Sequence, residues 1–270
     1  MQNILLCSDY SENAQKAIDL CLRLFKHDSK NYFLLNTFSF PPEETTDTIH
    51  IIDHLKAKSK KALEKEYLRI CQLAYSNYSL FKKQSVFGET ENVIKRFIDK
   101  NKVDLVVIGN QGMGHAPEKL FGSTTCKIID SIQVPLLLVP NSEQTPPPSY
   151  QLMLTEERKL YDKKWWYSMS ELNHEWSIPV HLFVIKEAGL SNSPKASPSI
   201  PFNSSSISYI HYFDENAFDS LNESIHQTIQ KELPSIFNVN ISNPHLLKEL
   251  FQHQNHLLYH QTPILLRQHV

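Results

Sequence analysis

Glycine is rare in this chain, and most of it is concentrated in one segment. Only 6 of the 270 residues are glycine, and four of these lie in a short stretch of the first half. Glycine has no side chain, so a backbone that contains it can approach a ligand closely. Helix N-termini bind phosphate through free backbone N–H groups. The spacing of Gly109, Gly112, Gly122, Ser123 and Thr124 therefore predicts a loop that binds the phosphates of a nucleotide.

Two better-known phosphate loops do not fit this segment. A P-loop requires a lysine directly after its second glycine, but Lys119 precedes Phe121 and Gly122. A dinucleotide-binding G-x-G-x-x-G would begin at Gly112, and Pro117 stands at its third glycine. We therefore expect neither a P-loop NTPase nor a Rossmann dehydrogenase.

The glycine segment follows one strand of a predicted parallel sheet. Short apolar runs alternate with amphipathic stretches of helical spacing through the first half of the chain. Such alternation predicts a parallel sheet covered by helices on both faces, where ligands bind beyond the carboxyl ends of the strands. The expected strands are 4–7, 32–35, 80–86, 105–108 and 135–139, and the expected helices cover 14–24, 51–75, 93–98 and 126–132.

A linker divides the chain into two halves of similar pattern. Three consecutive prolines at 146–148 exclude a helix or a central strand, so the expected domains are residues 1–142 and 149–270. The second half repeats the element order of the first, with expected strands at 151–154, 180–184, 207–210, 235–239 and 262–266. Its expected helices cover 162–175, 217–231 and 244–259. The sequence predicts an α/β fold with two tandem, doubly wound, five-stranded parallel-sheet domains, of which the second is altered.

Composition excludes several classes of protein. A net charge of −2 argues against a dedicated nucleic-acid binder, and no apolar run is long enough to span a membrane. The first residues lack the basic and apolar regions of a signal peptide. The four cysteines are widely separated, which is typical of a reducing compartment. We expect a cytoplasmic protein.

The signature G-x2-G-x9-G-[ST], formed by Gly109, Gly112, Gly122 and Ser123, resembles the ATP-binding signature of the universal stress protein family. The first strand and turn, residues 4–14, are similar to those of this family as well. The resemblance spans residues 1 to about 140. It implies the fold of the adenine nucleotide alpha hydrolase group, and ATP with magnesium as the ligand.

The resemblance also implies a role for individual residues. Cys7, Ser8 and Asp9 fall on the turn beside adenine and ribose, where the Asp9 carboxylate contacts the ribose or its metal. Thr37 falls at the strand end that supplies backbone contacts to adenine, and Ile108 ends the strand before the glycine segment. The contacts to ribose and phosphates would come from Gly109, Gly112, Gly122, Ser123 and Thr124.

The second half does not keep these features. Residues 240–243, which contain no glycine, stand where the segment from Gly109 to Gly112 stands, and Glu157 corresponds roughly to Asp9. A backbone without glycine cannot easily wrap around a phosphate. We therefore expect no nucleotide in the second domain.

The expected function is binding without catalysis, in nucleotide sensing or scaffolding during a stress response. No candidate general base or arginine finger accompanies the loop, and phosphoryl transfer needs such groups. Two alternatives are a partner-binding scaffold with an empty site and a slow ATP-hydrolysing enzyme of the adenine nucleotide alpha hydrolase group. The resemblance further implies a homodimer, with the two domains of one chain packed as a pseudo-dimer.

Three histidines offer a metal-binding alternative in the second half. His253, His256 and His260 share one face of an expected helix, which is compatible with zinc ligation. No cysteine or carboxylate completes a ligand set. We favour a polar helix face or a dimer contact and expect no metal ligands of this kind.

Overall fold

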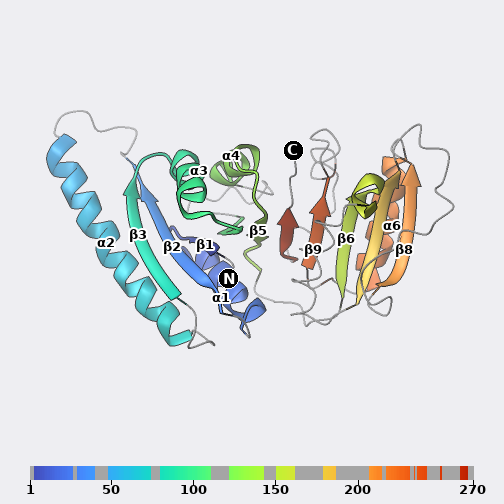
Figure 1. The fold of residues 1–270 in the computed structure, drawn as a ribbon, viewed down its shortest axis with the longest axis horizontal. Coiled ribbons are helices and arrows are strands. Elements are labelled where there is room, and N and C mark those ends of the chain that lie inside the picture. Colours follow the sequence, from blue (N-terminus) through green and yellow to red (C-terminus); the bar gives the residue numbers. More distant parts are fainter. Residues whose placement is uncertain are drawn as a thin grey trace. The chain divides into compact units, whose positions relative to one another are not determined.

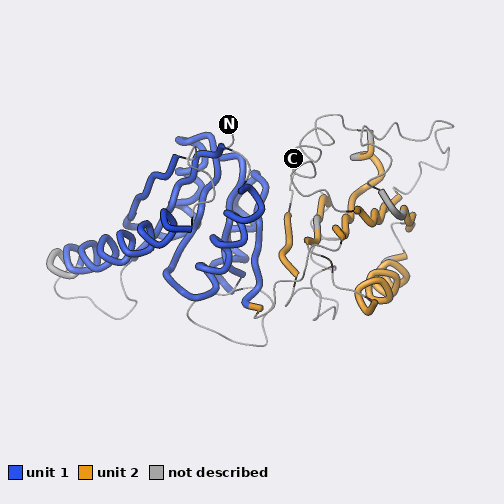
Figure 2. The backbone as a smooth tube through the Cα atoms, turned by 90° about the horizontal axis from the view of Figure 1, so that it is seen from below, with its two compact units in different colours: residues 1–141 blue, residues 142–270 orange. Residues whose placement is uncertain are grey.

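The computed structural model divides the chain into two compact units, residues 1–141 and 142–270 (Figure 2). Each unit is a parallel sheet with flanking helices, and each is described separately below (Figure 1). The residues described are 3–26, 29–39, 48–73, 80–110, 122–142, 150–161, 179–186, 207–214, 217–231, 234, 236–241, 250 and 262–266.

The first unit contains all five strands expected from its sequence. They pair in parallel in the order β3-β2-β1-β4-β5. The strand order reverses between β1 and β4, which makes their carboxyl ends the topological switch point of the sheet. The strands are β1 (Asn3–Cys7), β2 (Asn31–Phe38), β3 (Leu80–Phe87), β4 (Leu105–Gly109) and β5 (Leu136–Val139).

Four helices of the described residues cover this sheet in two pairs. Helix α1 packs against α2, and α3 packs against α4. The central strands are buried on both faces: Leu5, Leu6, Val106 and Val107 are fully inaccessible to solvent. Burial on both faces explains why these strands are continuous apolar runs. The helices are α1 (Glu12–Leu24), α2 (Thr48–Leu73), α3 (Thr90–Asn101) and α4 (Ser123–Ser131).

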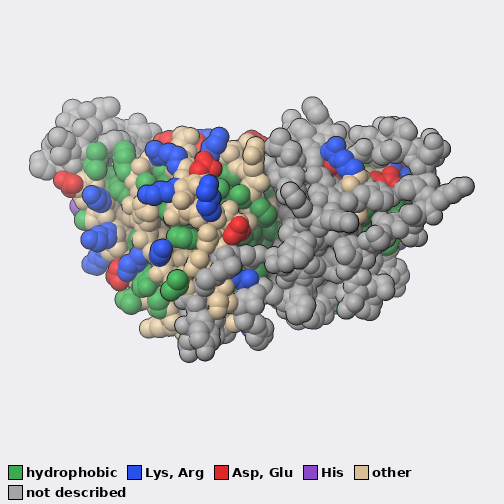
Figure 3. All heavy atoms as spheres, viewed as in Figure 1, with side chains coloured by type: hydrophobic (Ala, Val, Ile, Leu, Met, Phe, Trp, Pro, Cys, Tyr) green, Lys and Arg blue, Asp and Glu red, His purple; other side chains and the backbone are tan. Residues whose placement is uncertain are grey.

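The long helix α2 carries many lysines on its exposed side. Figure 3 shows one face of the first unit, where lysine and arginine side chains are interspersed with hydrophobic and acidic ones. An amphipathic helix at a sheet face is expected to expose its charged side in this way. The exposed lysines of α2 are Lys56, Lys58, Lys60, Lys61 and Lys65.

The second unit repeats the strand order of the first. Its parallel sheet has the order β10-β9-β6-β7-β8, so β6 takes the central place of β1 and β9 that of β4. The expected helix at 217–231 is observed as α6 (Phe218–Lys231), and a short 3-10 helix, η1 (Glu157–Tyr161), follows β6. The strands are β6 (Gln151–Glu156), β7 (Val180–Lys186), β8 (Ile207–Asp214), β9 (Ile236–Asn240) and β10 (Ile264–Leu266).

Matching hydrogen bonds fix which residues of the two units correspond. The Val106 N–H donates to the Pro135 carbonyl over 2.9 Å, and the Phe237 N–H donates to the Pro263 carbonyl over the same distance. Together with the register of the central strands, these bonds make Asn240 the counterpart of Gly109 and Glu156 the counterpart of Asp9. The expected counterpart of Asp9, Glu157, was therefore one residue too late. Strand β6 extends to Glu156.

Some predicted features cannot be compared with the structure. The expected helices at 162–175 and 244–259, together with His253, His256 and His260, lie outside the described residues. In the described part of the chain, no group of three or more His, Cys, Asp or Glu side chains could hold a metal ion. The helices of that part include none with the length and apolar character needed to cross a lipid bilayer.

Candidate functional site

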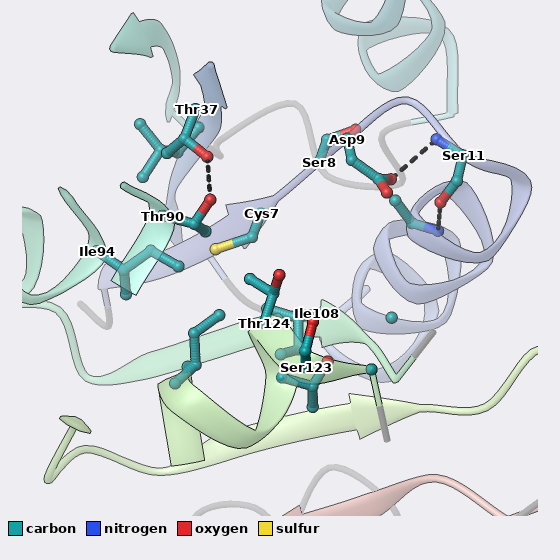
Figure 4. A pocket seen from close by; sticks show the side chains of 16 residues that line it. Cys7, Ser8, Asp9, Ser11, Thr37, Thr90, Ile94, Ile108, Ser123 and Thr124 are labelled. Atoms are coloured by element: carbon teal, nitrogen blue, oxygen red, sulfur yellow. Dashed lines mark hydrogen bonds between the residues drawn. The ribbon is translucent and has the colours of Figure 1, made fainter. Parts of the chain in front are cut away.

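A cavity of about 400 Å³ lies at the carboxyl edge of the first sheet. Its walls come from the strands β1, β2 and β4 and from the first turns of α1, α3 and α4 (Figure 4). The position is the switch point where open α/β sheets bind ligands. Nine of the ten predicted site residues line it: Cys7, Ser8, Asp9, Thr37, Ile108, Gly109, Gly122, Ser123 and Thr124. The tenth, Gly112, lies outside the described residues.

The turn after β1 holds Asp9 in place through hydrogen bonds to neighbouring backbone. The Ser11 N–H donates to Oδ1 of Asp9 over 3.0 Å, and the Tyr10 N–H donates to Oγ of Ser8 over 3.1 Å. Ser11 itself caps α1, since its Oγ accepts from the Ala14 N–H over 3.2 Å. The carboxylate of Asp9 therefore serves the turn with one oxygen and lines the cavity.

A buried polar cluster attaches this turn to β2 and α2. Nδ2 of Asn36 donates to the Ser8 carbonyl over 2.7 Å, and the hydroxyl of Ser59 on α2 donates to Oδ1 of Asn36. The Tyr10 hydroxyl donates to the Ser59 carbonyl over 2.9 Å. Tyr10 has φ of 67°, in the left-handed region that is costly for a bulky residue. The contact with Ser59 helps to hold this backbone conformation.

The N-terminus of α4 forms the opposite wall of the cavity. Gly122 is the residue before the helix, and it has no side chain with which to cap the first turn. The hydroxyl groups of Ser123 and Thr124 stand on that turn and are exposed (Figure 4). Helix N-termini attract anions through their backbone N–H groups and the helix dipole. This wall is suited to phosphate oxygens.

Two hydrogen bonds join the ends of the segment between β4 and α4. The Gly122 N–H donates to the Asn110 carbonyl over 2.9 Å, and Oγ1 of Thr125 donates to the same carbonyl over 3.3 Å. The Asn110 N–H donates to the Val139 carbonyl of β5 over 2.9 Å. The strand end and the helix start are therefore fixed to each other at the cavity wall.

Gly109 is needed here for helix packing. A Cβ atom at Gly109 would lie 2.6 Å from Nδ2 and 2.8 Å from Cγ of Asn13 on α1. Real Cβ contacts are not this short, so a side chain at this position would force the buried Asn13 side chain, or the helix that carries it, to move. The closest contacts of Gly109 thus indicate a packing role. The residue also lines the cavity, and its expected role in bringing the backbone close to a phosphate stays a prediction.

The cavity is apolar at one end and polar at the other. Figure 4 shows Ile94 and Cys7 beside Thr37 and Thr90, with Asp9 and the start of α1 on the other side. The hydroxyls of Thr37 and Thr90 are 2.7 Å apart and hydrogen-bonded. Asp9 is the charged residue among the described lining residues, which include no lysine, arginine or histidine.

Seven lining residues escaped the sequence analysis. Most come from the first turns of helices, whose approach to the cavity depends on the arrangement in space. Gly88 and its neighbours could have pointed to Thr90, because a glycine after a strand marks the turn into the next helix. The seven are Ser11, Ala14, Leu35, Thr90, Ile94, Thr125 and Ile128.

The surroundings of Cys7 favour the protonated form of its thiol. Burial raises the pKa of Cys7 to about 12 from an ordinary value of 9.0. Thiols react as thiolates, so at neutral pH this residue presents an uncharged sulfur to the cavity. Its contribution to a bound ligand is van der Waals contact.

The second unit places side chains where the first has its cavity wall. Asn240, the counterpart of Gly109, is buried, and its Nδ2 donates to Oγ1 of buried Thr155 over 3.5 Å. Glu156, the counterpart of Asp9, has a side chain only 5% exposed and forms an ion pair with Arg158 at 2.8 Å. The side-chain amide of Asn240 thus stands where Gly109 has no side chain, and the Glu156 carboxylate already has Arg158 as its partner.

Residues 1–140 match the model of the universal stress protein family. This match covers more than half of the 270 residues, and the chain belongs to the universal stress protein family. No curated protein matches the chain.

Solved structures extend the similarity of fold to the whole chain. A universal stress protein from Archaeoglobus fulgidus DSM 4304 aligns over 98% of this chain and 96% of its own, with a TM-score of 0.67 and 12% identity. A protein of unknown function from Pseudomonas aeruginosa PAO1 aligns over 99% of this chain and 92% of its own, with a TM-score of 0.57 and 11% identity. The universal stress protein UspA from Lactobacillus plantarum covers 51% of this chain and 97% of its own, at 20% identity and a TM-score of 0.45. The predicted α/β fold with parallel sheets is confirmed.

Proposed function

We propose that the first unit binds one adenine nucleotide, ATP with magnesium, and that the protein acts as a nucleotide-responsive or scaffolding module in a stress response. One observation carries this proposal. Residues from the ends of β1, β2 and β4 and from the start of α4 converge on a single cavity at the switch point of the sheet. Its volume of about 400 Å³ lies within the range of small-molecule sites.

The polarity of the cavity sets the direction of the nucleotide. The base occupies the apolar end beside Thr37 and Ile94, and the ribose lies near Asp9 (Figure 4). The phosphates reach the N-terminus of α4, where Ser123 and Thr124 add hydroxyl donors. Each part of the ligand then meets a wall of matching chemistry.

Magnesium fits this set of residues. Mg²⁺ takes oxygen ligands and is commonly bound through one or two carboxylates together with substrate phosphates. The Asp9 carboxylate would hold the ion with the phosphates, and it retains Oδ2 for this purpose while Oδ1 accepts from Ser11. The metal would neutralise phosphate charge in a cavity whose described lining has no basic side chain.

We further propose that the protein is not an enzyme. Besides the metal, rapid phosphoryl transfer requires a residue that orients the attacking water and a cationic side chain that stabilises the transition state. Asp9 is already engaged with the Ser11 N–H and with the proposed magnesium, and the described lining residues include no lysine, arginine or histidine. The cytoplasmic location, the homodimer and the packing of the two domains as a pseudo-dimer stay predictions.

The second unit is proposed to be a structural copy without a nucleotide. The amide of Asn240 occupies the place of the Gly109 backbone approach, and Glu156 is engaged with Arg158. A ligand there would have to displace a buried amide and break an ion pair. The expected stoichiometry is therefore one nucleotide per chain.

Two measurements on the purified full chain test the proposal. Mass spectrometry of the native protein identifies any retained nucleotide, and thermal melting with and without Mg-ATP reports binding through the stabilisation that a ligand confers. We expect a higher melting temperature with Mg-ATP. Absence of a retained nucleotide together with an unchanged melting temperature would contradict nucleotide binding and favour a partner-binding scaffold.

The Gly122→Val variant localises the effect. Gly122 has φ of −63° and ψ of 155°, an extended conformation that valine adopts readily. The variant should fold, but its side chain would stand at the α4 N-terminus and abolish the Mg-ATP shift. A shift equal to that of the parent protein would show that the phosphate wall is assigned incorrectly.

A further inference from the structure

We propose that the hydrogen-bonded pair Thr37–Thr90 selects the base of the bound nucleotide, favouring a purine with a hydrogen-bonding group at position 6, such as adenine. A purine that has only hydrogen at this position would be rejected. The inference rests on the proposed function, because it concerns the apolar end of the same cavity. It assigns specificity to two side chains that lie 53 positions apart in the sequence.

The pair stands at the meeting point of a strand and a helix. Thr37 lies near the carboxyl end of β2, and Thr90 is the first residue of α3. Gly88, with φ of 140°, turns the chain between β3 and α3, and its N–H donates to the Phe38 carbonyl over 2.9 Å. These contacts bring the hydroxyls of Thr37 and Thr90 within hydrogen-bonding distance of each other on the cavity wall (Figure 4).

The two hydroxyls retain unused hydrogen-bonding capacity. Each threonine hydroxyl carries one donor and can accept through two lone pairs. Their mutual bond of 2.7 Å uses one donor and one acceptor, and within the described residues neither hydroxyl has a further hydrogen bond. The pair therefore offers one O–H donor and free acceptor positions on adjacent oxygens. The amino group and neighbouring ring nitrogen of adenine present a donor and an acceptor side by side.

The surroundings make this pair the polar feature of its end of the cavity. Ile94 and Ile108 line the cavity through hydrocarbon, and Cys7 contributes an uncharged sulfur because burial raises its pKa to about 12. Thr37 and Thr90 are partly buried, and a base bound against them would cover their hydroxyls. A covered polar group without a partner is costly. A site that is built to hydrogen-bond a substrate group discriminates strongly against an analogue that lacks it. The hydroxyl pair thus distinguishes purines that bind the apolar walls equally well.

The test compares ATP with purine riboside triphosphate, which differs from ATP by the missing 6-amino group. Calorimetric titration of the full chain, with magnesium present, gives both dissociation constants. We expect the wild-type protein to bind ATP at least about tenfold more tightly. In Thr37→Val and in Thr90→Val the ratio should fall below about threefold, chiefly through weaker ATP binding, since valine preserves the shape and removes the hydroxyl.

Two further variants control this comparison. Thr228→Val removes a partly buried hydroxyl on α6 that donates to the Ser224 carbonyl over 2.8 Å, and it should leave both affinities unchanged. Thr37→Ser retains the hydroxyl and should retain the preference for ATP, which separates hydrogen bonding from a general effect on β2. Melting curves verify that each variant is folded.

The possible outcomes separate this inference from the proposed function. Equal affinities of the wild-type protein for both nucleotides would overturn the role of the pair and leave nucleotide binding intact. The same conclusion follows if the valine variants keep the wild-type ratio. Binding of neither nucleotide by the wild-type protein would overturn the proposed function, and the inference with it.

Discussion

A Cβ atom at Gly109 would lie 2.6 Å from Nδ2 of Asn13, so the approach of α1 to the end of β4 requires glycine. Asn13 is buried, and its Nδ2 donates to Oδ1 of Asn110 over 3.3 Å. One residue of the ATP-binding signature is thereby explained by the packing of a helix on a strand. The cavity depends on this contact, because α1 carries Ser11 and Ala14 on its wall.

Gly109→Ala is expected to destabilise the protein by about 1–3 kcal/mol through overpacking against Asn13. The Asn13→Ala change removes the two side-chain atoms nearest to the added methyl group. In a double-mutant cycle measured by urea unfolding, the double variant should therefore lose less stability than the sum of the two single variants. Additive losses would show that the close approach does not govern this position.

Ser59→Ala is expected to lower stability by about 1–3 kcal/mol, because it leaves the buried amide of Asn36 without the Ser59 hydroxyl. It should also weaken Mg-ATP binding, since Asn36 holds the Ser8 carbonyl. Ser131→Ala is the matched control: its hydroxyl donates to the Ile128 carbonyl at the end of α4. Equal losses of stability and affinity in the two variants would contradict the proposed support of the turn by α2.

Asp9→Asn is expected to weaken Mg-ATP binding about tenfold or more, because charge-assisted contacts are stronger than neutral ones. The amide oxygen can still accept from the Ser11 N–H, so the turn should persist. Glu156→Gln makes the same chemical change at the corresponding position of the second unit. Titration calorimetry of Glu156→Gln should give the Mg-ATP affinity of the parent protein and the same stoichiometry of one nucleotide per chain. A loss of binding in Glu156→Gln would place a nucleotide in the second unit.

Alkylation should distinguish Cys7 from the two exposed cysteines. At pH 8, iodoacetamide is expected to modify the exposed Cys71 and Cys126 in the folded protein. Cys7 should remain unmodified, because its pKa of about 12 leaves almost no thiolate. Peptide mass spectrometry before and after denaturation measures this pattern. Rapid labelling of Cys7 in the folded state would contradict its protection.

The raised pKa of Cys7 also predicts a dependence of stability on pH. The unfolded chain loses the thiol proton near pH 9, whereas the folded protein retains it up to about pH 12. Over this interval the folded state binds more protons, so stability falls as pH rises. Urea unfolding should show a weaker decline between pH 9 and pH 11 for Cys7→Ala than for the wild-type protein. Identical declines would show that burial does not perturb this thiol.

The central strands of the first unit were predicted well because both of their faces are buried. Runs such as Leu105–Ile108 are apolar throughout, and this pattern needs no knowledge of neighbouring elements. Thr90 and Ser59 were missed because each contacts a partner far away in the sequence: Thr37 for Thr90 and Asn36 for Ser59. Such pairs become visible only when the strand order is known.

Corresponding positions in the second unit were harder to assign. The prediction of Glu157 as the counterpart of Asp9 was off by one residue, since a sequence pattern does not fix where β6 ends. The sequence also predicted only part of what replaces Gly109 in the second unit. Loss of glycine was evident, but the bond from Asn240 to Thr155 appears only in three dimensions.

The hydrogen bond from the Gly122 N–H to the Asn110 carbonyl joins the end of β4 to the start of α4 through backbone atoms alone. Replacing either residue, other than by proline at position 122, therefore leaves both partners of this bond in place. The junction between strand and helix is set by the path of the backbone, so the side chains around it can differ while this part of the cavity wall keeps its shape.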